Sequence, residues 1–350
     1  MSHIPTRRTT PRPVSAPPAG PSPDGGHDER MAELTRESRM GGLGTENRER
    51  VIRRIDMRDF DERRAEITDA LWSAATESGF FQITGHGIGG DDVDAAFAAA
   101  EKFFALPEEA KGRHPLKKGL NAGWESMTQV RPSTGTADQK ESYQLTRPHM
   151  AGLWPERELP GFRETLLEFE SRCRDVALRV LSCFAERLGM EREFFDHAHD
   201  PASPGYQSTL RLLHYFPVPS GAESEGVWRA GAHTDFDCLT LLFQREGQGG
   251  LQVCPGKDAD GQEWTPVVPA ADVITCNIGD MLMRWSDDRL PSTFHRVTGP
   301  GPDDDHGDRY SIAFFAQADR DVEIVSPGGT YPPITAAAYL RERISANFAR

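Results

Sequence analysis

The chain has 350 residues, a formal net charge of −14 and 37% hydrophobic residues. The acidic balance argues against nucleic acid or an anionic membrane as the main partner, and no run approaches the roughly 18 apolar residues of a membrane span. Five cysteines without a Cys-x-x-Cys pair argue against a disulfide framework or a zinc ribbon and favour a cytoplasmic location. We expect no obligate protein partner.

Residues 1–50 are predicted to form a disordered, proline-rich tail. Seven prolines lie within residues 1–25, and such a stretch cannot bury enough apolar surface to offset the entropy lost on ordering. The alternative is a flexible segment that covers an active site or touches a partner. The rest of the chain, residues 51–350, is predicted to form a single domain.

The first part of that domain, residues 51–205, is predicted to be mainly helical. Apolar residues recur at helical spacing over residues 62–79, 91–106 and 161–188. Between the first two helices, Phe80–Thr84 is typical of a short buried strand. Residues 112–150 show little periodicity, so loops and short strands are expected there.

After about residue 205 the apolar period changes from 3.6 to 2. The short apolar runs are Leu210–Phe216, Cys238–Phe243, Leu251–Cys254, Trp264–Val268, Val273–Cys276, Met281–Trp285, Thr293–Val297, Tyr310–Phe315 and Val322–Val325. They predict a jelly-roll core, that is a double-stranded β-helix, over residues 206–330. An amphipathic helix within residues 331–350 closes the chain. The expected fold class is therefore α+β, mainly β.

One pair of side chains suggests a metal site. His233 and Asp235 lie two residues apart, so on a strand they would face the same side. A second histidine would complete a two-His, one-carboxylate triad, which leaves coordination positions open and suits Fe(II). The spacing alone is weak evidence, because the sequence holds three His-x-acid triplets where about two are expected by chance. We interpret the rival His197 and His199 as a solvated helix end.

Several ordered motifs strengthen this hypothesis. They are Gly79–Gly87, Gly231–Gln244, Asn277–Ser286, Pro291–Val297 and Arg309–Phe315. From about residue 50 to its end, the chain resembles the isopenicillin N synthase-like family of Fe(II)/2-oxoglutarate oxygenases.

The resemblance implies a metal site and a co-substrate site. Fe(II) would be held by His233, Asp235 and His295, with O₂ and 2-oxoglutarate as co-substrates. Arg309 and Ser311 would hold the far carboxylate of 2-oxoglutarate. The residue types suit that role, because arginine presents a planar donor fork that matches a carboxylate, and a serine two residues along a strand faces the same way.

The segment Leu210–Pro217 leaves two alternatives open. Many relatives have a tyrosine here that reaches the co-substrate or the substrate. If the residue that faces the pocket is Phe216, that hydroxyl contact is absent. If the pocket lies on the other side, Arg211 and Tyr215 are the candidate contacts.

The function implied by the resemblance is a dioxygenase that oxidises a small molecule, by hydroxylation or by desaturation or ring closure. The first alternative is an oxidase of the isopenicillin N synthase type, which uses no 2-oxoglutarate. In that case Arg309 and Ser311 would bind a carboxylate of the substrate. The second alternative is a jelly-roll binding module without catalysis.

Overall fold

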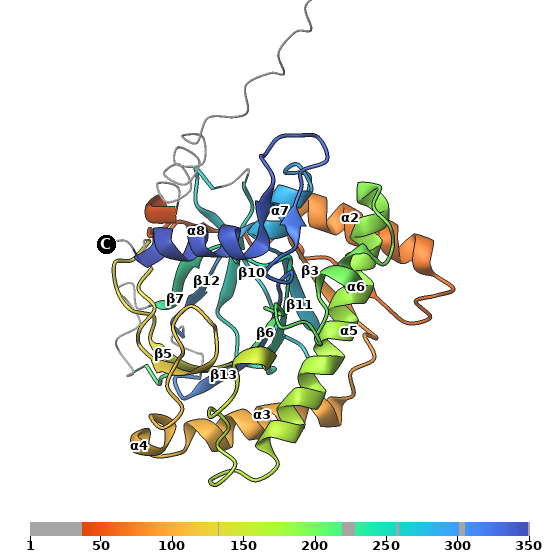
Figure 1. Cartoon of the computed structure of the whole chain (residues 1–350). Coiled ribbons are helices and arrows are strands. Elements are labelled where there is room, and N and C mark those ends of the chain that lie inside the picture. Colours follow the sequence, from red (N-terminus) through yellow and green to blue (C-terminus); the bar gives the residue numbers. More distant parts are fainter. Residues whose placement is uncertain (1–36, 132, 219–227, 257–258, 301–304, 349–350) are drawn as a thin grey trace, which may run out of the picture.

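The structure, a computed structural model, describes residues 37–131, 133–218, 228–256, 259–300 and 305–348, with the side chains of the final helix described as far as residue 343 (Figure 1). Its core consists of two β-sheets. The larger sheet contains, in spatial order, β2 (Arg54–Asp56), β3 (Phe80–Thr84), β11 (Ile274–Ile278), β8 (Leu239–Gln244), β13 (Arg309–Ala316), β6 (Thr209–Tyr215), β5 (Lys140–Leu145) and β4 (Gly123–Ser126). The smaller sheet contains β1 (Thr45–Glu46), β10 (Glu263–Pro266), β9 (Leu251–Cys254), β12 (Phe294–Thr298) and β7 (Trp228–His233).

Alternation along the strands separates two faces of the larger sheet. On the inner face, Leu213 of β6 and Ala313 of β13 pack against Val253 and Val297 of the smaller sheet. On the outer face, residues such as Phe314 belong to the main hydrophobic core that also includes the helices. The two sheets therefore enclose an interior of their own, as in a jelly roll.

Helices cover the outer face of the larger sheet (Figure 1). The three that contribute most are α2 (Arg64–Ser78), α3 (Gly90–Phe104) and the long α5 (Phe162–Leu188). The others are α4 (Glu108–Lys111), α6 (Phe194–Ala198), α7 (Asp280–Trp285) and α8 (Ala336–Phe348). Gly79 ends α2 with φ of 69°, a left-handed conformation that a side chain would disfavour. That turn leads the chain directly into β3.

The predicted fold class and the predicted long helices are confirmed, and most strands agree within two residues. The predicted strand Met281–Trp285 is wrong, because this segment is helix α7, whose buried residues Met281, Leu282 and Trp285 follow helical spacing. Strand β7 was not predicted, since its sequence WRAGAH has few large apolar residues. The run at 322–325 forms β14 (Glu323–Ile324), which pairs only with β15 (Ile334–Thr335).

The N-terminal part of the chain contributes more to the sheets than its helical pattern indicates. Strands β2 to β5 belong to the larger sheet, so residues 51–205 are not only a helical layer. Within the predicted tail, Met40 is buried and β1 pairs with β10; residues 1–36 lie outside the described residues. The division into a tail and a single domain stays a prediction.

Two further sequence-based expectations concern the cysteines and membranes. All five cysteines are buried with free thiols, so they are small core groups here. Within the described ranges, no helix combines the length and the apolar character needed to cross a membrane.

Candidate active site

Three candidate ligands converge where the smaller sheet ends. His233 is the last residue of β7, and His295 on β12 lies directly opposite it in register. Asp235 follows two residues after β7, and its Oδ1 lies 3.9 Å from Nε2 of His233 and 3.8 Å from Nε2 of His295. One ligand atom from each residue falls within 4.8 Å of the others. One metal ion could therefore contact all three.

Backbone carbonyls orient the two histidines. The Nδ1 atom of His233 lies 2.8 Å from the carbonyl oxygen of Gly231, and Nδ1 of His295 lies 3.2 Å from that of Thr293. A carbonyl oxygen can only accept, so each Nδ1 carries the proton and each Nε2 offers a lone pair to the shared space. Burial, reinforced by the charge of Arg131, keeps the pKa of His233 well below its usual value. The neutral imidazole is the form that binds a metal.

Asp235 is held by two donors from the larger sheet. Its Oδ2 accepts hydrogen bonds from Thr240 Oγ1 at 2.6 Å and from Asn277 Nδ2 at 2.9 Å. Thr240 on β8 and Asn277 on β11 face each other in register. Neither residue was predicted from the sequence, although the period-2 pattern of β8 places Thr240 on the inner face. With Oδ2 occupied, Oδ1 is the oxygen that faces the two histidines.

The route by which His233 and Asp235 come together differs from the predicted one. We expected both on one strand that leads into Cys238–Phe243, with alternation placing them on one face. Instead, His233 ends β7, and Asp235 lies in the connection between β7 and β8. The turn of this connection, and not strand alternation, brings the carboxylate back to the imidazole.

The loop that carries Asp235 is fixed from its outer side. The backbone N–H of Asp280 donates to the carbonyl oxygen of Asp235 at 2.8 Å. Arg343 of α8 forms an ion pair with Asp280 at 2.6 Å, and its guanidinium carbon lies 5.0 Å from the centre of the Phe236 ring. Helix α8 thus supports the metal loop through contacts that no local sequence pattern indicates.

Arg309 and Ser311 lie on the inner face of β13. Arg309 pairs with Tyr215 and Ser311 with Gln244, and Arg309 is only 2% exposed. Its Nε donates to the carbonyl oxygens of Gln248 at 3.2 Å and Gly249 at 2.9 Å.

One buried donor atom on each of these two side chains lacks a hydrogen-bond partner in the described residues. Neither Nη1 of Arg309 nor Oγ of Ser311 has a hydrogen-bond partner in the described part of the chain. Buried donors without a partner are costly. Burial also lowers the pKa of Arg309, because a guanidinium without a counter-ion is disfavoured there. A carboxylate such as that of 2-oxoglutarate would satisfy both donors, so these residues fit the implied co-substrate.

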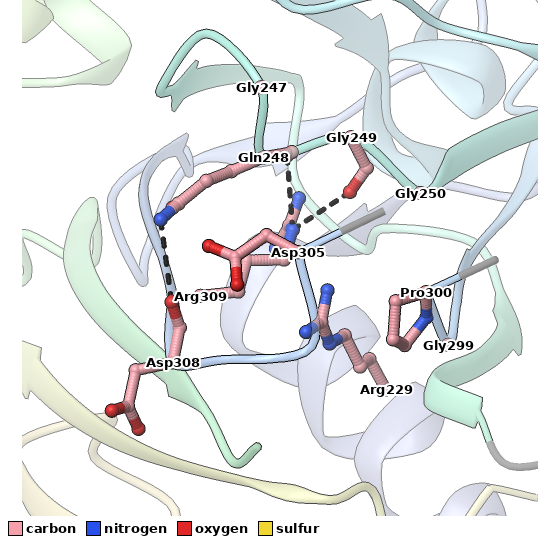
Figure 2. A pocket seen from close by; sticks show the side chains of 10 residues that line it. All are labelled: Arg229, Gly247, Gln248, Gly249, Gly250, Gly299, Pro300, Asp305, Asp308 and Arg309. Atoms are coloured by element: carbon pink, nitrogen blue, oxygen red, sulfur yellow. Dashed lines mark hydrogen bonds between the residues drawn. The ribbon is translucent and has the colours of Figure 1, made fainter. Parts of the chain in front are cut away.

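A surface pocket adjoins Arg309 (Figure 2). Its walls come from β7, from the glycine-rich turn after β8, and from the connection between β12 and β13 with the first residue of β13; the lining residues are Arg229, Gly247, Gln248, Gly249, Gly250, Gly299, Pro300, Asp305, Asp308 and Arg309. None of the three candidate metal ligands lines it. The reacting substrate is therefore expected in the interior between the sheets and not in this pocket.

Of the two alternatives for β6, the structure places Arg211 and Tyr215, and not Phe216, on the face between the sheets. Arg211, Leu213 and Tyr215 alternate onto the inner face, where Leu213 and Tyr215 join the cluster between the sheets. Tyr215 lies beside Arg309, whose guanidinium carbon is 4.7 Å from the centre of the tyrosine ring. Phe216 follows the strand and packs edge-on against the ring of His214, an outward residue. The face of β6 that carries Arg211 and Tyr215 is therefore the one that lies between the sheets.

The rival histidines do not assemble into a site. His197 is exposed on α6, whereas His199 is buried, with Nδ1 2.8 Å from the carbonyl oxygen of Phe195. Burial lowers the pKa of His199 to about 4, so our interpretation of this segment as a solvated helix end is wrong for His199. Across the described ranges, the only group of three potential ligands is that of His233, Asp235 and His295.

Comparison with known proteins gives consistent results. Residues 206–318 match the model of the 2OG-Fe(II) oxygenase superfamily, and residues 52–159 match that of the N-terminal region of non-haem dioxygenases in morphine synthesis. A proline hydroxylase of Petromyces alliaceus is 34% identical over 78% of this chain and 89% of its own length. A 2-oxoglutarate-Fe(II) type oxidoreductase of Emericella nidulans is 32% identical over 82% of this chain and 86% of its own.

Solved structures agree with the sequence relatives. A full-length Neurospora crassa protein in complex with α-KG and thymine superimposes with a TM-score of 0.74 and 31% identity, over 85% of this chain and 97% of that one. The match therefore includes both the helical layer and the two sheets.

Proposed function

Because the chain belongs to the superfamily of 2-oxoglutarate- and Fe(II)-dependent oxygenases, we propose that His233, Asp235 and His295 bind its Fe(II) and that Arg309 and Ser311 bind its 2-oxoglutarate. The protein is a non-haem dioxygenase that acts on a small molecule, with Fe(II) as cofactor and with 2-oxoglutarate and O₂ as co-substrates. The hypothesis that the protein is an enzyme is confirmed. The two alternatives, an oxidase without 2-oxoglutarate and a binding module without catalysis, are not supported by the relatives, several of which are named as 2-oxoglutarate-dependent enzymes.

One observation carries the assignment of the metal ligands. Three ligand atoms of the types that Fe(II) accepts lie within 4.8 Å of one another, and every other polar atom of these side chains is already engaged. The two Nδ1 atoms face carbonyl oxygens, and Oδ2 of Asp235 accepts two hydrogen bonds. Such oriented ligands occupy one side of an ion and leave its other positions open.

The co-substrate assignment is supported by the two buried donors that lack a partner in the described ranges. Arg309 Nη1 and Ser311 Oγ would donate to the far carboxylate of 2-oxoglutarate, an interaction that charge strengthens. Tyr215, whose ring packs on the Arg309 guanidinium, would hold that guanidinium in place. We assign Tyr215 to this end of the site.

Bound Fe(II) supplies the redox chemistry, in which oxidative decarboxylation of 2-oxoglutarate by O₂ gives succinate and CO₂ and drives oxidation of the substrate. The side chains of this protein bind the substrate and the co-substrate, orient them, and exclude water from the site. Phe80 packs edge-on against the His295 ring at 5.4 Å between centres, and Leu213 and Val297 fill the interior nearby. We propose hydroxylation as the outcome, with desaturation or ring closure as alternatives, and a cytoplasmic location stays a prediction.

The experiment compares point variants by their Fe(II) binding under anaerobic conditions and by their release of succinate under aerobic conditions. His233→Ala and Asp235→Ala should lose Fe(II) binding and release of succinate while the far-ultraviolet circular dichroism stays that of the wild type. His197→Ala, an exposed histidine of the rival pair, is the matched control and should retain both. Fe(II) binding at wild-type affinity in either of the first two variants would remove that residue from the site.

A second comparison addresses the co-substrate. Arg309→Ala should raise the 2-oxoglutarate concentration needed for half-maximal succinate release by at least tenfold, because a charge-assisted bond contributes about 1.5–3 kcal/mol. An unchanged requirement would mean that another residue binds the far carboxylate.

A further inference from the structure

A second arginine lies in the interior between the sheets. Arg211 on β6 pairs with Ala313, whereas Arg309 pairs with Tyr215 four residues further along the same strand. Four residues of strand correspond to about 13 Å, so the two arginines mark separate positions on one face. The guanidinium carbon of Arg211 lies 4.9 Å from the centre of the Phe315 ring, and Phe315 pairs in register with Thr240, the residue that donates to Asp235. Arg211 is therefore on the side of the interior that faces the candidate metal ligands.

Arg211 has no acidic side chain in direct contact in the described part of the chain. Its Nη2 donates to the neutral Gln144 Oε1 at 2.8 Å, and its guanidinium carbon lies 4.9 Å from the centre of the Phe315 ring. Its Nε is buried and has no hydrogen-bond partner there. Burial lowers the pKa of Arg211. Arg211 as a whole is partly buried, and a charge withdrawn from water without a counter-ion is disfavoured, so a protein retains one where something else supplies the opposite charge.

The acid nearest in this network reaches Arg211 only through an amide. Gln144 accepts from Arg211 and donates from Nε2 to Glu125 Oε1 at 2.9 Å. The Glu125 carboxylate also accepts from Ser142 at 3.0 Å and from Gln129 at 2.6 Å. This chain of bonds holds the guanidinium in one orientation, and it leaves Nε without a hydrogen-bond partner in the described residues. The arrangement is that of a preorganised binding group.

The neighbouring ion pairs do not supply the missing counter-ion. Asp138 already serves two cations, Arg131 at 3.0 Å and Lys140 at 2.6 Å. The charge of Arg131 also acts on Arg211 and, after burial, further lowers its pKa, against the opposing influence of Glu125. An anion bound at Arg211 would offset both its burial and this repulsion.

We propose that Arg211 binds a carboxylate of the substrate, so that the substrate is a small organic acid whose oxidised carbon lies between this carboxylate and the metal ligands. The planar guanidinium matches a carboxylate, and the apolar residues between the sheets, such as Leu213, suit the rest of such a molecule. The inference rests on the proposed function, because it names the substrate class of the same site.

The test uses the holoenzyme, reconstituted with Fe(II) and 2-oxoglutarate without O₂. The visible absorption band of the Fe(II)–2-oxoglutarate chelate reports on the proposed function itself. The probes are phenylacetate, indole-3-acetate and octanoate, each compared with its primary amide. We expect at least one acid to shift the band, and to stimulate succinate release once O₂ is added, at a concentration at least tenfold lower than its amide.

Arg211→Gln should abolish this preference of the acid over the amide, and Arg211→Lys should retain part of it. The matched control is Arg245→Gln, which removes a partly buried arginine at the end of β8 that packs on Phe97 and pairs with Glu101. It should keep the preference. If the band forms but no acid is preferred, or if Arg211→Gln keeps the preference, this inference fails alone. If the band does not form in the wild type, the proposed function fails first.

A measurement of stability separates a binding role from a structural one. Arg211 is a partly buried cation without a counter-ion, and replacing it with an apolar side chain of similar length removes the cost of taking its charge out of water. Arg211→Met, without substrate, should therefore have a melting temperature at or above that of the wild type. A clear fall would make Arg211 a structural residue and would overturn the proposal.

Discussion

The metal affinity of this protein should depend on a residue that never touches the metal. Asn277, on β11, donates to Oδ2 of Asp235 at 2.9 Å and is buried. In Asn277→Ala that oxygen keeps only its bond from Thr240 at 2.6 Å. The carboxylate can then turn in its plane, and Oδ1 is no longer held toward the two histidines. The structure therefore predicts weaker metal binding with the three ligands intact.

The size of the effect follows from the bond that is lost. A hydrogen bond to a charged acceptor contributes about 1.5–3 kcal/mol, and about 1.4 kcal/mol corresponds to a tenfold change in an equilibrium constant. We therefore expect the dissociation constant for Fe(II), or for Mn(II) as a redox-inert substitute, to rise about 10- to 100-fold. The double variant Thr240→Val/Asn277→Ala should lose more than either single variant, because Oδ2 then has no donor.

Calorimetric titration of the metal-free protein with Mn(II), and anaerobic titration with Fe(II), measure this directly. The control is Gln82→Ala on the neighbouring strand β3, an equally buried amide that bonds to the carbonyl oxygen of Val268 at 3.0 Å and makes no contact with Asp235. It should lose stability toward urea but keep its metal affinity. If Asn277→Ala binds the metal as the wild type does, or if Gln82→Ala weakens binding equally, the reasoning is refuted.

Three further variants test other parts of the structure. Ser311→Ala should raise the 2-oxoglutarate requirement for succinate release about tenfold without lowering the melting temperature, because its hydroxyl has no partner in the described ranges; an unchanged requirement would contradict its role. Gly279→Ala should lower the free energy of unfolding in urea by about 1–3 kcal/mol, because a Cβ would lie 2.2 Å from the carbonyl oxygen of Asp237, and wild-type stability would contradict this. Burial alone would lower the pKa of His214, but hydrogen bonds to the carboxylates of Glu141 and Asp308 raise this pKa above its usual value of 6.5. Stability from this histidine is thus complete below about pH 6.5 and is lost as the pH rises through the raised pKa, so His214→Gln should flatten that part of the unfolding profile, and an unaltered profile would contradict it.

The sequence by itself determined the elements whose signals are local. The helical periods that produce α2, α3 and α5, and the period-2 runs of the sheets, depend on residues a few positions apart. The family motifs pointed to His233, Asp235 and His295, and the structure brings these three together. The hydrophobic pattern gave a wrong or no assignment of secondary structure where the segment was short. The apolar run of α7 fits a strand or a helix equally well, and β7 has too few large apolar residues to be noticed.

Only the tertiary structure decided how the site is built. Thr240 and Asn277 become partners of Asp235 because β8 and β11 pair in one register, and a shift of one residue would turn both away. Closure of one sheet over the other decides which face of β6 is interior, and therefore that Arg211 lies on the same face as Leu213 and Tyr215 while His214 lies on the outer face. These choices depend on contacts between residues far apart in the chain, and no local period encodes them.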